Sequence, residues 1–301
     1  RDMTHTIHVV DVFTDRPLAG NQLAVVLGAE DIPGEVMQRI AKEMNLDETT
    51  FVLPPDDPAH AARVRIFTPA VEMPFAGHPT VGTAWVLYTH GLVPGAALEF
   101  TLEEGVGPVR VRGIEGPEGL TFWMTHPPVS FAEVFSDRDR VADAIGVTPG
   151  DLLANVPVQV ATTGVPFLYV PMKDARAVDV AESNQPKLRE LFRGAEAVPA
   201  FIFASLGGNR LYSRMFAPHV FDIPEDPATG SGSGPLAAFA VKYGLVPRAP
   251  KVVLVSEQGV KMGRRSVIHI ELTYDPGSEL PSKIEVGGTV RQVLTGTLSD
   301  F

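Results

Sequence analysis

Three polar side chains stand where this sequence could support acid–base chemistry. Glu48 lies between a predicted helix and an apolar strand, in the segment Asn45-Leu-Asp-Glu-Thr-Thr-Phe51. Burial in a cleft raises the pKa of a carboxylate, which suits such a group to proton transfer near neutral pH. His78 could shuttle a proton, and Asp226 could hydrogen-bond a substrate amine or orient His78. The ordinary alternatives are a loop carboxylate, a histidine that donates to a backbone carbonyl, and an aspartate that forms a turn before proline.

Two glycine-led turns, at 77–79 and 230–232, each precede a stretch of helical length that is apolar on all sides. A helix of that kind is buried, and its first N–H groups need a partner in the protein or in a ligand. Together with the helix dipole, such an end binds anions. Gly77, Gly230 and Ser231 are therefore candidates to hold a small carboxylate. The alternative is that these residues only cap their helices.

The two turns belong to an internal repeat. Both segments begin Phe-x-Pro, at Phe67 and Phe216, and both end Gly-Leu-Val, at Gly91 and Gly244. From the first glycine of the turn to the last glycine, 77 to 91 and 230 to 244, the spacing is 14 in both cases. The repeat predicts two similar halves whose buried helix ends face one cleft from opposite sides.

The elements that must position these residues are mostly strands. Apolar runs of strand length, separated by turn signals, occur in both halves. One long apolar helix is predicted in each half, at 79–90 and 234–243, with polar-faced helices at 35–44 and 180–192. Many strands with one central helix per half do not favour a wound βαβ sheet. The pattern predicts the α+β class, with two pseudo-symmetric domains that each wrap a curved mixed or antiparallel sheet around a central apolar helix.

The domain boundary is predicted in the Gly/Pro-rich stretch 113–119 or shortly after Pro127-Pro128, and we take the first of these. The first domain then comprises residues 1–118, and we expect a final strand pair, from about 284 to 301, to return to it. The second domain comprises residues 119–283. The active site is expected in the cleft between the two domains.

The composition argues against several classes of function. With 301 residues and 45% hydrophobic content, the chain has the size and make-up of a soluble two-domain protein. Its net charge is −11 without a basic cluster, so neither nucleic acid nor an anionic membrane is an expected partner. No apolar run reaches the ~20 residues of a membrane span. With no export signal, the expected location is the cytoplasm.

The sequence predicts neither a metal nor a cofactor. It contains no cysteine, so thiolate ligands, disulfides and thiol nucleophiles are all absent. Its histidines are scattered without metal-ligand spacing. The run Gly230–Gly234 lacks the Lys-Ser/Thr of a phosphate-binding loop and the βαβ context of a dinucleotide fingerprint.

Four segments resemble the PhzF phenazine-biosynthesis family, and together they span nearly the whole chain. They begin at Val10 (Val-Asp-Val-Phe-Thr, then Gly-Asn-Gln-Leu-Ala-Val-Val after five residues), at Glu48 (Glu-Thr-Thr-Phe-Val), at Arg65 (Arg-Ile-Phe-Thr-Pro, running to Gly-His-Pro-Thr) and at Glu225 (Glu-Asp-Pro-Ala-Thr-Gly-Ser). The resemblance implies the diaminopimelate-epimerase-like fold, a homodimer and a reaction without a cofactor. The best-understood member isomerises trans-2,3-dihydro-3-hydroxyanthranilate.

The resemblance also implies roles for individual residues. Glu48 becomes the acid–base residue that moves a proton between ring carbons. His78, Asp226 and Ser231 bind and polarise the substrate. The remaining substrate-binding groups are the backbone N–H groups of Gly77 and Gly230 and the side chain of Asn21, in a turn that reads Gly-Asn-Gln where the family pattern is Gly-Asn-Pro.

The absence of cysteine then bears on the reaction. Diaminopimelate epimerase and proline racemase use a facing pair of thiols on opposite sides of a carbon, and this chain cannot form that pair. A single carboxylate can remove and return a proton on one face only. We therefore expect a cofactor-independent isomerase that acts on a small carboxylate-bearing substrate. The alternatives are an epimerase or other acid–base enzyme that uses Asp226 and His78, and an inactive protein that binds a small carboxylate.

Overall fold

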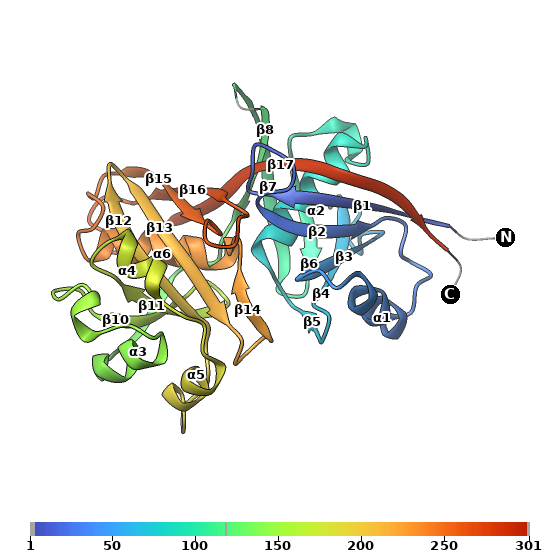
Figure 1. The fold of residues 1–301 in the computed structure, drawn as a ribbon. Helices are drawn as coiled ribbons and strands as arrows, with labels where there is room; N and C mark the ends of the chain where they lie inside the picture. The colour runs from blue at the N-terminus through green and yellow to red at the C-terminus, as the bar shows by residue number, and fades with distance from the viewer. Residues whose placement is uncertain (1–3, 118, 300–301) are drawn as a thin grey trace. The chain divides into compact units, whose positions relative to one another are not determined.

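The computed structural model describes residues 4–117 and 119–299 (Figure 1). The chain forms two compact units. The first contains the chain up to Thr125 and the segment from Gly287 onward, and the second contains His126–Val286. In the described part of the chain, no helix is both long enough and apolar enough to cross a bilayer.

The first unit is a mixed sheet wrapped around one helix. The strands pair in the order β1–β2–β3–β4–β6–β7–β8, and β17 pairs with both β1 and β8. The β2–β3 and β4–β6 pairs are parallel, and the others of that order are antiparallel. Helix α2 packs against β1, β2, β3, β7 and β8. The elements are β1 (His5–Val12), β2 (Asn21–Val26), α1 (Gly34–Met44), β3 (Glu48–Leu53), β4 (Ala62–Phe67), β5 (Glu72–Met73), α2 (Gly77–Thr89), β6 (Glu99–Glu104), β7 (Gly107–Gly116), β8 (Gly119–Thr125) and β17 (Lys283–Leu298).

The second unit has the same plan. Its strands pair in the order β9–β10–β11–β12–β13–β15–β16, with β11–β12 and β13–β15 parallel. Helix α6 packs against β10, β11 and β16. The elements are β9 (Ser130–Phe135), α3 (Arg138–Ala144), β10 (Val158–Thr162), β11 (Pro166–Pro171), α4 (Ala175–Val180), α5 (Gln185–Leu191), β12 (Ala200–Gly207), β13 (Arg210–Ala217), β14 (Ile223–Asp226), α6 (Gly230–Lys242), β15 (Lys251–Gln258) and β16 (Ser266–Thr273). Short 3₁₀ turns lie at Pro94–Ala96 and Pro149–Asp151.

The internal repeat is therefore a repeat of topology, and the predicted α+β class is confirmed. In each unit three antiparallel strand pairs follow one another, joined through two parallel contacts. The buried helix lies between the second and third pair in both units and has 13 residues in each. Gly77 and Gly230 are the first residues of these two helices. The sequence repeat thus marks the same structural point twice.

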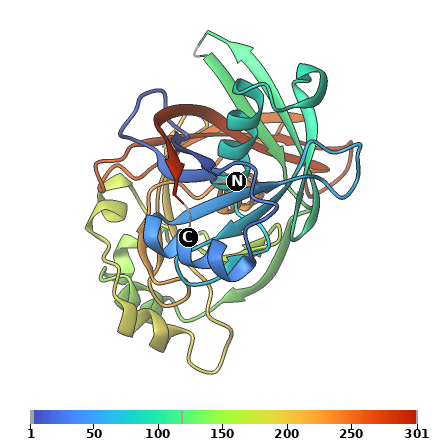
Figure 2. The ribbon, with the colours of Figure 1, turned by 90° about the vertical axis from the view of Figure 1, so that its right-hand side faces the viewer.

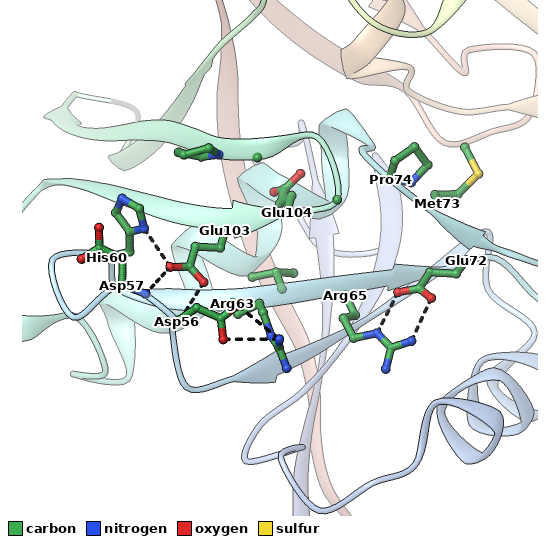
Figure 3. A pocket seen from close by; sticks show the side chains of 14 residues that line it. Asp56, Asp57, His60, Arg63, Arg65, Glu72, Met73, Pro74, Glu103 and Glu104 are labelled. Carbon is green, nitrogen blue, oxygen red and sulfur yellow. Dashed lines mark hydrogen bonds and ion pairs between the residues drawn. The ribbon is translucent and has the colours of Figure 1, made fainter.

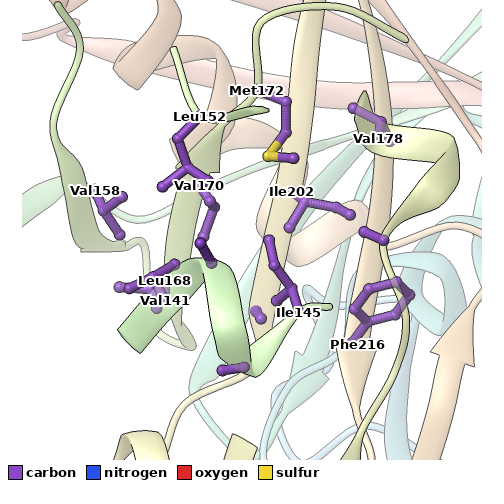
Figure 4. Packing of buried hydrophobic residues seen from close by; sticks show 14 of the residues in the cluster. Val141, Ile145, Leu152, Val158, Leu168, Val170, Met172, Val178, Ile202 and Phe216 are labelled. Carbon is purple, nitrogen blue, oxygen red and sulfur yellow. The ribbon is translucent and has the colours of Figure 1, made fainter. Parts of the chain in front are cut away.

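A second apolar layer covers the outer face of the second unit's sheet. Helices α3, α4 and α5 pack there against β11, β12 and β13 (Figure 4). The cluster includes Val141 of α3 and its C-cap residue Ile145, Leu168 and Val170 of β11, and Ile202 of β12. Each such side chain, when fully buried, stabilises the fold by about 1.5–3 kcal/mol. The sheet is thus held between α6 and this helical layer.

Three predicted elements differ from the structure. Helix α6 begins at Gly230 instead of residue 234, because the Thr229 carbonyl accepts from both the amide and the hydroxyl of Ser233, at 3.1 and 2.8 Å. The helix predicted at 180–192 begins only at Gln185, since Asn184 caps it at the Lys187 amide, and the separate helix α4 ends at Val180. The expected final strand pair is the single long strand β17. It runs antiparallel to β1, so its C-terminal part lies beside the start of β1 (Figure 2).

Candidate active site

Glu48 and His78 come together within the first unit. Strand β3 begins at Glu48 and runs parallel to β2, with Glu48 opposite Leu23. Helix α2, which carries His78 in its first turn, packs against both strands. Glu48 Oε2 lies 3.4 Å from His78 Nε2, and the two side chains are only 13% and 5% exposed. Residues that the sequence separates into two motifs thus form one polar cluster.

The neighbours of His78 determine which ring nitrogen carries the proton. Nε2 faces two acceptors, the Gln22 carbonyl at 3.2 Å and the Glu48 carboxylate, so it carries a hydrogen. Nδ1 lies 3.1 Å from Asn21 Nδ2 and accepts from that amide. Burial lowers the pKa of His78 to about 3, and the Gln22 carbonyl opposes this shift only in part. At neutral pH the ring is therefore uncharged, with its hydrogen on Nε2.

This tautomer gives the two side chains different chemical capacities. His78 has no lone pair left for a substrate proton, because Asn21 occupies Nδ1 and Nε2 carries the hydrogen. The Glu48 carboxylate, whose Oε2 lies 3.4 Å from Nε2, is the group of the two that can take up a proton. In this cluster Asn21 and the Gln22 carbonyl orient the ring, and the carboxylate lies beside it.

The first backbone amides of α2 have no acceptor within the helix. Its N-cap residue is Ala76, whose side chain makes no capping hydrogen bond to the first turn. The Thr80 amide donates to the Ala76 carbonyl at 3.3 Å, and Pro79 has no N–H. The amides of Gly77 and His78 therefore lack an intrahelical acceptor. Because the whole first turn is buried, an anion bound there would meet the positive end of the helix with little screening by water.

In the second unit, Asp226 is oriented by residues that lead into α6. Thr229 Oγ1 donates to Asp226 Oδ2 at 2.5 Å. Gln258, fully buried at the end of β15, donates through Nε2 to the Asp226 carbonyl and to Thr229 Oγ1, both at 2.8 Å. Its Oε1 accepts from the Thr229 amide at 3.1 Å. Gln258 thus orients Thr229, and Thr229 orients the Asp226 carboxylate.

Gly230 and Ser231 form the buried start of α6. The first amide that donates within the helix is that of Ser233, to the Thr229 carbonyl at 3.1 Å. The amides of Gly230 and Ser231 therefore lack an intrahelical acceptor, as at the start of α2. The Tyr169 hydroxyl donates to the Gly232 carbonyl at 2.7 Å and fixes this turn against β11. Asp226 and the start of α6 thus form one cluster in the second unit.

Sequence reasoning missed three residues beside these turns: Thr229, Gln258 and Glu104. Thr229 stands directly before a glycine-led helix, a position where threonine is favoured, and that signal could have been used. No local pattern marks the other two. Glu104 ends β6, and its Oε1 lies 2.7 Å from Thr80 Oγ1 in α2. Burial raises the pKa of Glu104 to about 8, although its hydrogen bond with Thr80 opposes the shift.

A pocket of about 940 Å³ lies elsewhere on the first unit (Figure 3). Its lining includes Arg65, paired with both oxygens of Glu72 at 2.7 and 2.8 Å, and His60, paired with Glu103 at 2.8 Å. None of the predicted site residues lines it. Across residues 4–117 and 119–299, no three His, Cys, Asp or Glu residues gather as a metal site requires.

Comparison with known proteins gives the chain a family. The model of the phenazine biosynthesis-like proteins, PhzC-PhzF, matches residues 10–296. A protein of Mesorhizobium japonicum named an uncharacterized isomerase is 37% identical, over 98% of this chain and 99% of the relative. A trans-2,3-dihydro-3-hydroxyanthranilate isomerase of Pseudomonas aeruginosa is 34% identical, over 94% of this chain and 95% of the relative.

Solved structures agree with this relationship. A phenazine biosynthesis protein of the PhzF family from Bacillus anthracis matches with a TM-score of 0.90 and 26% identity, over 99% of this chain and all of the other. A hydroxyproline epimerase from Agrobacterium vitis matches with a TM-score of 0.65 at 14% identity, over 98% of this chain and 92% of the other, which extends the likeness of fold to epimerases. The chain therefore belongs to the phenazine biosynthesis-like protein family, PhzC-PhzF, and is an isomerase of that family.

Proposed function

We propose that the protein moves a proton on one face of a small carboxylate-bearing substrate, with Glu48 as the acid–base residue and without a cofactor. The substrate we propose resembles a dihydro-hydroxyanthranilate, because that molecule is the one named for the Pseudomonas aeruginosa relative. The proposed acid–base residue belongs to the Glu48 cluster of the first unit, and the proposed contact with the substrate amine belongs to the Asp226 cluster of the second.

The observation that carries this proposal is the hydrogen-bonding of His78. Its Nδ1 accepts from Asn21 and its Nε2 donates to the Gln22 carbonyl, so the ring has no free lone pair, and Glu48 beside it is the group we propose as the base. Acid–base catalysis by one positioned group contributes on the order of 10²–10⁴-fold.

The two helix starts supply the proposed carboxylate site. The amides of Gly77 and Gly230, with the amide and hydroxyl of Ser231, are buried donors at the starts of α2 and α6. A preorganised donor of this kind contributes about 3–4 kcal/mol where charge develops in a transition state. The Asp226 carboxylate, oriented by Thr229, would receive the substrate amine. A proton removed next to a conjugated system can then return to another carbon on the same face.

The two alternatives make different predictions. An epimerase with His78 as one of two bases needs a free imidazole lone pair, which the hydrogen bonds of this ring do not leave. A binding protein without activity predicts that a small carboxylate stabilises the fold by mass action and is released unchanged. We also propose that the protein acts as a homodimer in the cytoplasm, which light scattering and cell fractionation would test.

The test is proton exchange by a Glu48→Gln variant. Trans-2,3-dihydro-3-hydroxyanthranilate is incubated in D₂O, and deuterium incorporation and product are followed by NMR. We expect Glu48→Gln to bind the compound but to lose exchange by at least about 10²-fold. Glu35→Gln, an exposed glutamate at the start of α1, is the matched control and should exchange at the wild-type rate. Exchange by Glu48→Gln at the wild-type rate would show that Glu48 is not the base.

A further inference from the structure

The topological repeat extends to the strand that follows each buried helix. In the first unit β4 pairs with β6 so that Arg63 is opposite Glu103. In the second unit β13 pairs with β15 so that Tyr212 is opposite Glu257. Arg63 and Tyr212 each stand four residues before the phenylalanine that opens the sequence repeat. The next residues, Glu104 and Gln258, therefore occupy the same position in the two units.

A glycine follows each of these residues and lies against the proline before the buried helix. A Cβ at Gly105 would lie 2.7 Å from the Cα of Pro74, and a Cβ at Gly259 would lie 2.6 Å from the carbonyl oxygen of Pro227. Figure 3 shows Glu104 and Pro74 at the edge of the pocket in the first unit. The chain thus passes close enough to the turn, in both units, for the preceding side chain to reach the start of the helix.

Glu104 and Gln258 both engage a threonine hydroxyl at that helix start. Glu104 reaches Thr80, four residues after the N-cap position of α2, and Gln258 reaches Thr229, the N-cap of α6. Gln258 is fully buried, and Glu104 is 8% exposed. Each side chain thus ties its strand to the turn whose amides are proposed to hold the substrate carboxylate.

The hydrogens at the two threonines allow both side chains to act as donors. Thr80 Oγ1 has one hydrogen but lies 2.7 Å from Glu104 Oε1 and 2.8 Å from the Ala76 carbonyl, both of which are acceptors when Glu104 is ionised. If Glu104 keeps its proton, it donates to Thr80, and Thr80 donates to Ala76. In the second unit the Gln258 amide donates to Thr229, and Thr229 donates to Asp226. The two donor chains have the same direction, away from the strand and into the turn.

We propose that Glu104 and Gln258 are a matched pair of positioning residues, each an uncharged donor that sets one of the two amide-bearing turns. Gln258 also sets the carboxylate of Asp226 through Thr229. The inference rests on the proposed function only in taking these turns as the carboxylate site. It gives a positioning role to Glu104, a buried glutamate that takes no part in the proposed proton transfer.

If Glu104 and Gln258 are such a pair, replacing glutamate by glutamine at position 104 and glutamine by glutamate at position 258 should have different effects on the two turns. Glu104→Gln places at position 104 the residue that the other unit already uses, so the Gly77–His78 turn should keep its conformation. Glu104→Met has a similar length but no donor, and the turn should shift. Gln258→Glu replaces the donating amide by a carboxylate that faces the Asp226 carbonyl and Thr229 Oγ1, so the Gly230–Ser231 turn should shift.

The experiment is amide NMR of the ¹⁵N-labelled full chain at pH 7, without ligand. We expect Glu104→Met to move the resonances of Gly77 and His78 while those of Gly230 and Ser231 stay in place, and Gln258→Glu to do the reverse. Glu104→Gln should leave all four resonances at their wild-type positions. A role in stability alone would lower the melting temperature of Glu104→Met but leave the resonances of its folded form unchanged, and that result would overturn the proposal.

Two further outcomes bear on the inference. If Glu104→Gln moved the Gly77 and His78 resonances as far as Glu104→Met does, the two positions would not be equivalent and the pairing would be refuted. Because no substrate is present in this experiment, loss of the Glu48 proposal in the exchange assay would leave the readout unaffected. The reverse also holds, since deuterium exchange at Glu48 does not depend on how Glu104 is assigned.

Discussion

Replacement of Glu104 by glutamine should change how the stability of the first unit depends on pH. The Glu104 carboxyl is buried, and burial raises its pKa from 4.5 to about 8, although the hydrogen bond with Thr80 opposes this shift. Above pH 4.5 the unfolded chain releases this proton while the folded chain keeps it. The free energy of unfolding therefore falls as pH rises from 4.5 to about 8 and becomes independent of this group above that pH.

The magnitude follows from the width of the pH window. Each pH unit in which the folded chain binds one more proton lowers the free energy of unfolding by about 1.4 kcal/mol. His78 and His126, whose pKa values burial lowers from 6.5 to about 3, act in the opposite sense, because their unfolded forms bind protons below pH 6.5. Above pH 6.5 only the Glu104 effect of these three remains. Between pH 6.5 and 8 the wild-type protein should thus lose about 2 kcal/mol of stability.

Tryptophan fluorescence makes the measurement specific to the first unit. The two tryptophans of the chain, Trp85 in α2 and Trp123 in β8, both lie in that unit. Urea unfolding at fixed protein concentration would be followed by their emission at half-unit pH steps from 5.5 to 9. Glu104→Gln should remove the decline between pH 6.5 and 8. The same slope in both proteins would show that Glu104 is already ionised at neutral pH, and the donor assignment at Thr80 would fail.

Further variants test the other contacts of the two clusters. Asn21→Ala should free His78 Nδ1 and reduce proton exchange without loss of binding, measured by NMR in D₂O and by calorimetry with the unreacted compound. Thr229→Val removes the donor to Asp226 and should cost about 1–3 kcal/mol of stability, measured by urea unfolding, because a buried carboxylate loses a partner. Tyr169→Phe leaves the buried Gly232 carbonyl without this donor and should cost a similar amount, seen as a lower melting temperature.

Much of the fold follows from local patterns in the sequence. The apolar helix at α2 and the repeated Phe-x-Pro and Gly-Leu-Val signals were enough to predict two like units with one buried helix in each. The start of α6 was not predictable from propensity, because the run Gly230–Gly234 is a poor helix former. It is helical because burial and the Ser233–Thr229 bonds outweigh that propensity. Local patterns therefore predicted the elements better than their ends.

The candidate site was likewise predictable only in part. His78 and Asp226 could be named because they lie in short motifs at the predicted turns, and Glu48 because it lies in a short motif between a predicted helix and strand. The direction of the His78 hydrogen could not be predicted, since it depends on Asn21 and on the Gln22 carbonyl, which β2 brings to the ring from outside the motif. Gln258 and Glu104 were missed for a related reason, because only the parallel pairing of β13 with β15 and of β4 with β6 brings them to the turns.

Parallel strand pairing explains why the same topology positions both the turn at the start of the buried helix and the residue that contacts this turn. Two parallel strands must be joined by a crossover connection. Between β4 and β6 this connection contains α2, and between β13 and β15 it contains α6. The strand that closes the crossover must return beside the first strand of the pair, so its end lies near the start of the helix. A residue at that end can therefore set the helix start without belonging to the motif that defines it. The equivalent position can therefore have the same role in each unit, as Glu104 in the first and as Gln258 in the second, provided that the side chain is uncharged and donates.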